Sequence, residues 1–137
     1  MTTSLHSTVY GFIKPANDAH TLGLQSAAEL LRECGYRVVI ANPKVQRALS
    51  HYREVPARRE IIDWIKTEKI SRLGLSYRLD QADAVNMVGY LYEELKNSGL
   101  MSFQGGAVEI IIFGGLPRTC QSIQREFKGP LICFQGG

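Results

Sequence analysis

The chain has 137 residues, 45% of them hydrophobic, and a formal net charge of +3. This length and composition suit a single globular domain spanning residues 1–137. The mild charge comes without a contiguous basic run, which disfavours nucleic acid as a partner. No apolar stretch is long enough to span a bilayer, and the N-terminus lacks the regions of a signal peptide, so we expect a cytoplasmic protein with no membrane partner.

Five short runs rich in β-branched and aromatic residues predict strands, and apolar residues at helical spacing predict helices between them. In chain order we expect strand 8–13, helix 21–34, strand 36–41, a broken helical region 44–69, strand 72–77, helix 81–97, strand 108–113, helix 117–127 and strand 131–134. Residues typical of helix ends support these limits: Gly35 and Gly99 follow predicted helices, and Asn42 precedes a proline as an N-cap. Alternating strands and helices imply a parallel sheet with helices on both faces.

The most specific pattern is Asp18-x-His20-x-x-Gly23, between the first strand and the first helix. In an open parallel sheet such turns lie at the carboxyl ends of the strands, where ligands bind. If His20 binds a metal through one ring nitrogen, the other N–H needs an acceptor, which Asp18 supplies. Lys14 is spaced to pair with that carboxylate, and Gly23 allows a large flat ligand to approach the backbone. The alternative is structural, with Asp18 as a helix cap and His20 incidental.

This pattern resembles the cobalamin-binding domain shared by adenosylcobalamin-dependent mutases, such as methylmalonyl-CoA mutase, and corrinoid methyl carriers. Gly74-Leu75-Ser76 ends the third predicted strand, where that family carries Ser-x-Leu. Gly114-Gly115 ends the fourth, where the family has a glycine pair. The resemblance covers nearly the whole chain and implies a flavodoxin-like (Rossmann-like), doubly wound, five-stranded parallel sheet.

The resemblance implies that cobalamin binds in the base-off/His-on mode, with the lower dimethylbenzimidazole base displaced from cobalt. His20 is then the lower cobalt ligand, and Asp18 accepts its second ring N–H. Lys14 matches the lysine that completes a His-Asp-Lys relay in acyl-CoA mutases of the family. Gly23 completes the motif on the first helical turn.

The two later motifs are implied to bind the displaced nucleotide tail. Ser76 hydrogen-bonds the base, while Gly114 and Gly115 leave room for the tail. Arg78 stands where the family has a leucine, which alters the wall of the base slot. Arg78 and Tyr77 both project from this strand end and are candidates to contact a cofactor amide or phosphate.

The chain also departs from the family in two longer features. A loop at residues 98–106 lengthens the gap between the serine and glycine motifs, and it either covers a ligand or simply connects two elements. The sequence stops at Gln135-Gly136-Gly137, where the family continues into a last helix. We therefore expect the domain to be truncated or part of a longer protein.

The family's mutases cover the cofactor with a catalytic barrel, which alone needs roughly 250 residues. We therefore expect a non-catalytic cofactor-binding subunit or domain of a mutase (isomerase) that presents cobalamin to a barrel partner for radical carbon-skeleton rearrangement. Only a few residues precede the first strand, without the helical cap of the methyl carriers, which favours adenosylcobalamin over methylcobalamin.

Two alternatives remain open. One is a corrinoid methyl carrier or the accessory cobalamin domain of a radical enzyme. The other is a cofactor-free flavodoxin-like module for interaction or sensing. The three cysteines, Cys34, Cys120 and Cys133, lack metal-ligand spacing, and we expect reduced thiols in apolar surroundings.

Overall fold

A computed structural model describes residues 7–16, 18, 22–77 and 80–135. Its five strands form one sheet in the order β2-β1-β3-β4-β5, and every neighbouring pair is parallel. This is the flavodoxin-like order, and it confirms the predicted doubly wound sheet. The strand bounds are β1 Val9–Ile13, β2 Arg37–Ile40, β3 Arg72–Ser76, β4 Ile110–Gly115 and β5 Leu131–Gln135.

The helices lie between the strands, as the periodicity predicts. The broken region 44–69 consists of two helices separated by a turn at residues 51–54. Gly35 has a φ of 95°, and Tyr36 N–H donates to the Leu31 carbonyl, which ends the first helix as expected. The bounds are α1 Leu22–Glu33, α2 Pro43–Ser50, α3 Val55–Glu68, α4 Gln81–Asn97, the short 3₁₀ helix η1 Ser102–Gln104, and α5 Pro117–Glu126.

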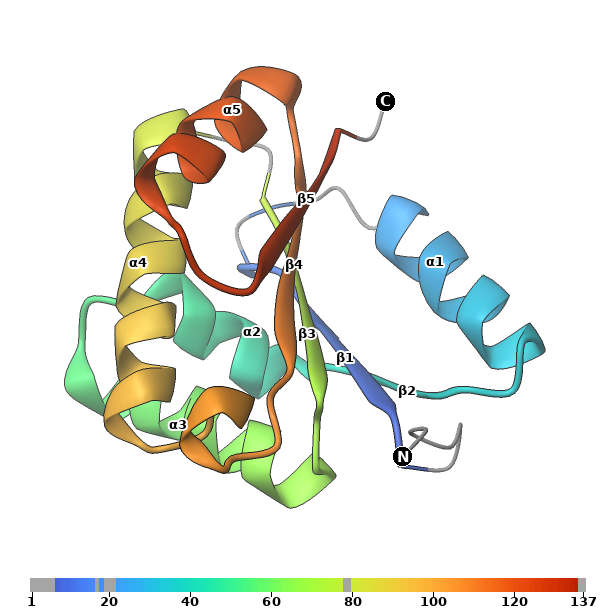
Figure 1. Ribbon diagram of the computed structural model, residues 1–137. Coiled ribbons are helices and arrows are strands. Elements are labelled where there is room, and N and C mark those ends of the chain that lie inside the picture. Colours follow the sequence, from blue (N-terminus) through green and yellow to red (C-terminus); the bar gives the residue numbers. More distant parts are fainter. Residues whose placement is uncertain (1–6, 17, 19–21, 78–79, 136–137) are drawn as a thin grey trace.

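The two faces of the sheet are covered unequally (Figure 1). The crossover from β1 to β2 runs toward one edge of the sheet, and the crossovers that follow run toward the other. Because parallel crossovers are right-handed, α1 must lie on one face and the later helices on the opposite face. Figure 1 shows α1 alone on its side, with α2, α3, α4 and α5 on the other.

The main core lies between the sheet and α2 to α5. Leu73, Leu75, Ile111 and Phe113 point to this side and are at most 1% exposed. Side chains of α3 and α4, including Ile61 and Leu91, complete the packing. This layer is where apolar burial stabilises the fold most.

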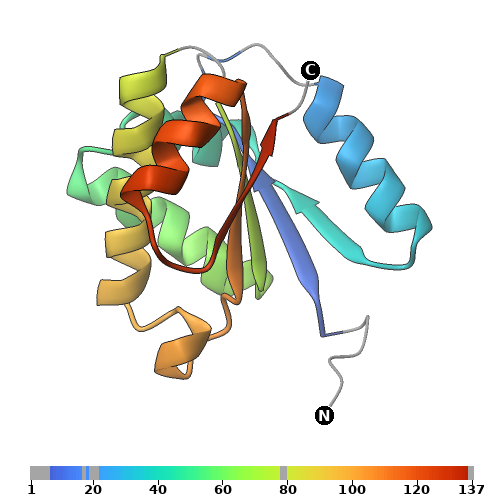
Figure 2. The same cartoon turned by 45° about the horizontal axis from the view of Figure 1, so that its top comes forward.

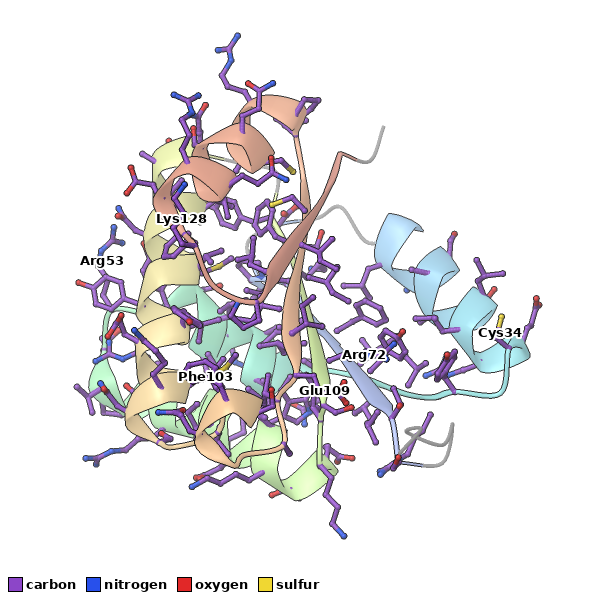
Figure 3. The ribbon with its side chains drawn as sticks, in the orientation of Figure 1. Cys34, Arg53, Arg72, Phe103, Glu109 and Lys128 are labelled. Atoms are coloured by element: carbon purple, nitrogen blue, oxygen red, sulfur yellow. The ribbon has the colours of Figure 1, made fainter. Side chains whose placement is uncertain are left out.

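The α1 face is buried mainly over β1 and β2. Tyr10, Ala28 and Val38 form a small second cluster there. No described helix covers β4 and β5 on this side, so Ile112 is half-buried and Ile132 is 46% exposed. The side chain of Arg72 also extends on this side of β3, where it donates a hydrogen bond to the Tyr10 hydroxyl (Figure 3).

The predicted cap of α2 is confirmed. Asn42 has an extended backbone, and its side-chain oxygen accepts a hydrogen bond from Val45 N–H at 3.0 Å. We expect Asn42→Ala to lower the free energy of unfolding by about 1 kcal/mol, measured by urea denaturation, because that N–H loses its acceptor. Asn86→Ala, at an exposed position inside α4, is the control. An equal loss in both variants would contradict the cap's contribution.

Within the described ranges, no helix combines the length and the apolar composition that crossing a bilayer requires.

Candidate functional site

The candidate site is the edge of the sheet at which the parallel strands end. The turns that follow β1, β3 and β4 meet there, and α1, α4 and α5 begin there (Figure 2). In open parallel sheets this edge is where ligands bind. Of the predicted site residues that the structure describes, Gly23 lies in the first turn of α1, and the others lie at the strand ends or in the turns that follow: Lys14, Asp18, Ser76, Gly114 and Gly115. The motif spacing and the topology therefore point to the same edge.

In the turn after β1, a buried lysine hydrogen-bonds two backbone carbonyls. Lys14 is 7% exposed, and its ammonium group donates hydrogen bonds to the backbone carbonyls of Pro15 (3.4 Å) and Asp18. Asp18 is fully buried, and its N–H donates to the Pro15 carbonyl at 3.1 Å. The predicted pairing of Lys14 with Asp18 therefore involves the backbone carbonyl of that residue. His20 lies outside the described residues, and Gly23 lies in the first turn of α1 as predicted.

Ser76 and Gly114 lie side by side. They are register partners at the carboxyl ends of β3 and β4, and both are half-buried. Strand alternation places both on the α1 side of the sheet, the side on which Ile112 points. Among the described residues, a methyl group at Gly114 would have only the Leu75 carbonyl oxygen near it, 4.0 Å away. Glycine therefore leaves open space at this point of the edge.

A side chain at position 115 would point to the opposite face of the sheet, away from α1. A methyl group there would lie 2.6 Å from the Phe113 ring and 2.8 Å from the Tyr77 carbonyl oxygen. Packing of the main core therefore accounts for this glycine by itself. Of the two glycines only Gly114 borders open space among the described residues, and the roles predicted for both glycines stay predictions.

The remaining residues predicted to contact the cofactor are Tyr77 and Arg78. Tyr77 is 4% exposed and its hydroxyl donates to Asp83 at the start of α4, while Arg78 lies outside the described residues. The loop at residues 98–106 lies at the opposite, amino edge of the sheet, where it leads through η1 toward β4 (Figure 2). This position fits a loop that connects two elements, and it does not fit a loop that covers a ligand at the carboxyl edge.

A carboxylate that the sequence did not single out is Asp83. It accepts hydrogen bonds from the hydroxyls of Tyr52 and Tyr77, both at 2.5 Å, and from Arg53 at 3.3 Å. In the sequence Asp83 is an ordinary acidic residue in a first helical turn. Tyr52 is 31 positions away in the chain and Tyr77 is six positions away, at no helical or strand spacing, so no local pattern indicates this cluster.

The cysteines show mixed environments. Cys34 is exposed at the end of α1 (Figure 3), so the expectation of apolar surroundings is wrong for it. Cys120 is buried and Cys133 half-buried. Burial raises the pKa of the Cys120 thiol, and it raises the pKa of the Cys133 thiol to about 12, so both thiols stay protonated at neutral pH. Within the described residues no group of three or more His, Cys, Asp or Glu side chains is placed to hold a metal ion.

Comparison with known proteins supports the fold. Neither a protein-family model nor a curated protein sequence matches the chain. Among solved structures it is similar to the 1.5 Å crystal structure of a novel cobalamin-binding protein from Desulfitobacterium hafniense DCB-2, with a TM-score of 0.54 and 21% sequence identity. The match covers 85% of this chain and 50% of that protein, so the chain spans about half of its length. At this identity the likeness shows a shared fold.

Proposed function

We propose that this chain binds cobalamin at the carboxyl edge of its sheet, in the base-off/His-on mode with His20 as the lower cobalt ligand. The observation that carries the proposal is the open space at Gly114, directly beside Ser76, on the face of the sheet that bears the Asp-x-His-x-x-Gly helix. The similarity to a solved cobalamin-binding protein supports it.

The residue types at this edge fit a displaced nucleotide tail. The tail ends in an aromatic base, which needs a hydroxyl partner, apolar walls and no obstructing side chain. Ser76 supplies the hydroxyl, and Gly114 leaves the space. Phe12 and Ile112, partly buried on the same face, supply the apolar surface. The charge of the buried Lys14 lies near the turn that carries Asp18 and His20, where it keeps the turn in place.

We further propose that the domain presents adenosylcobalamin to a catalytic barrel, as a subunit or domain of a mutase. When bound, the cofactor supplies homolytic cleavage of its cobalt–carbon bond, and the partner supplies the substrate. The residues of this chain would bind and orient the cofactor: His20 would ligate cobalt, and Asp18 would fix the tautomer of the histidine ring. The buried lysine at position 14 supports the mutase type over the methyl-carrier type.

The experiment is a cobalamin titration followed by visible absorption, with paramagnetic resonance of the reduced cobalt(II) state. We expect wild type to bind and to show a nitrogen splitting that changes from triplet to doublet when its histidines carry ¹⁵N. His20→Ala loses that protein-derived splitting. His51→Ala, whose side chain is 66% exposed and paired with Glu54, is the matched control and keeps it.

The outcomes separate the parts of the proposal. A wild-type chain that binds no corrinoid overturns cobalamin binding and favours the cofactor-free module. Binding with a splitting that survives in His20→Ala overturns the His-on mode alone.

A further inference from the structure

The Asp83 carboxylate joins three segments of the chain. Its hydrogen-bond donors are Tyr52 and Arg53, in the turn between α2 and α3, and Tyr77, directly after β3. Asp83 itself lies in the first turn of α4, which Asp80 caps by accepting a hydrogen bond from the Asp83 N–H at 2.8 Å. Both the side chain and the backbone of Asp83 are therefore held in place.

The hydrogen bonds of this cluster are charge-assisted. Tyr52 and Tyr77 are 3% and 4% exposed. Burial, together with the hydrogen bond to Asp83, raises the pKa of both hydroxyls, so they remain donors at neutral pH. Burial alone would raise the pKa of Asp83, but the bonds from Tyr52 and Tyr77 hold it below its ordinary value. Phenol donors to an ionised acceptor form strong, directional bonds.

One of the two tyrosines belongs to the candidate site. Tyr77 follows Ser76, and its N–H donates to the Gly114 carbonyl at 3.2 Å. Its own carbonyl lies against Gly115. Holding the Tyr77 side chain therefore sets where β3 ends relative to β4, and with it the place of the Ser76 hydroxyl beside Gly114.

We propose that the Tyr77–Asp83 hydrogen bond is a positioning contact for the cobalamin site, which acts through Ser76 and requires no contact of its own with the cofactor. This inference rests on the proposed function. It predicts that Tyr77 and Tyr52, which donate to the same carboxylate at the same distance, differ in their effect on the ligand. Tyr52 belongs to the α2–α3 turn and not to β3, so it does not adjoin Ser76 in the chain.

The test compares Tyr77→Phe with Tyr52→Phe. Each change removes one hydroxyl that donates to Asp83, so we expect similar decreases in the urea midpoint. Cobalamin affinity, measured by absorption titration, is expected to fall roughly tenfold in Tyr77→Phe, as for residues that orient ligand-binding groups, and to change less than about twofold in Tyr52→Phe.

In a Ser76→Ala background, Tyr77→Phe should cost much less affinity, because the two residues act together. Equal losses in the two phenylalanine variants, or full additivity with Ser76→Ala, overturn the inference.

Amide hydrogen exchange provides a readout without ligand. The amides of Ser76 and Tyr77 are expected to exchange faster in Tyr77→Phe than in Tyr52→Phe at matched stability, because the Tyr77 N–H bonds the Gly114 carbonyl. Unchanged exchange there contradicts the positioning role. Because this measurement needs no cofactor, it separates failure of the inference from failure of cobalamin binding, which the wild-type titration reports.

Discussion

Gly114→Val is expected to lose cobalamin affinity while the free domain stays folded. Valine suits a strand, and among the described residues its Cβ at position 114 would meet only the Leu75 carbonyl oxygen, 4.0 Å away. With the nucleotide tail beside the strand, the same side chain overpacks the site. Overpacking costs of ~1–3 kcal/mol correspond to roughly a 5- to 150-fold weaker affinity. Absorption titration measures the change.

The neighbouring glycine gives the opposite expectation. Gly115→Ala places a methyl group 2.6 Å from the Phe113 ring and 2.8 Å from a backbone oxygen that cannot move freely. We expect the free energy of unfolding to fall by about 1–3 kcal/mol in urea denaturation. Gly114→Ala, the matched control, is expected to be unchanged or stabilised by up to about 1 kcal/mol, because alanine restricts the unfolded chain. A Gly114→Val variant that binds as tightly as wild type would place the cofactor elsewhere.

Lys14→Met is expected to destabilise the turn after β1. The ammonium group donates to two backbone carbonyls, those of Pro15 and Asp18, in a site where Lys14 is only 7% exposed. Methionine has similar length but no donor, so both carbonyls lose the bond from lysine, and the Pro15 carbonyl keeps its bond from the Asp18 N–H. The loss of buried hydrogen bonds costs ~1–3 kcal/mol, and we expect a decrease of this size in the free energy of unfolding, measured by urea denaturation.

Lys44→Met is the matched control for this prediction. The Lys44 side chain is 74% exposed and pairs with Glu60 at 3.0 Å. Exposed ion pairs contribute ~1 kcal/mol or less, so this variant should stay close to wild type. Under the proposed function, Lys14→Met also loses cobalamin affinity, because Asp18 and His20 belong to the same turn. If Lys14→Met has the same free energy of unfolding as wild type, groups other than the lysine amine stabilise the turn.

The order and type of the secondary-structure elements were predictable from local signals. Strand alternation, helical periodicity and the residues Gly35, Asn42 and Gly99 depend on neighbours within a few positions, and the structure agrees with them. The carboxyl-edge location of the site was predictable too, because a motif placed after a parallel strand must lie at that edge.

The details of the site were less predictable. Gly114 and Gly115 look equivalent in sequence, yet one borders open space and the other borders the core. Which face is open follows from the strand order and the handedness of the crossovers, both of which are long-range properties. Asp83 likewise gains its role only when Tyr52, 31 positions away, and Tyr77 come beside it.

The sequence by itself therefore determined the alternation of strands and helices, the helix ends and the edge at which the motifs gather, because these depend on local backbone geometry and on the shared direction of parallel strands. Only the tertiary structure decided which face of the sheet remains open, that Ser76 borders Gly114, that the Lys14 amine holds backbone carbonyls, and that Asp83 joins the end of β3 to α4. The open face and the Ser76–Gly114 pair depend on pairing between residues far apart in the chain. The bonds of Lys14 and of Tyr77 join residues close in sequence, but the packing of the whole fold sets the direction of these side chains.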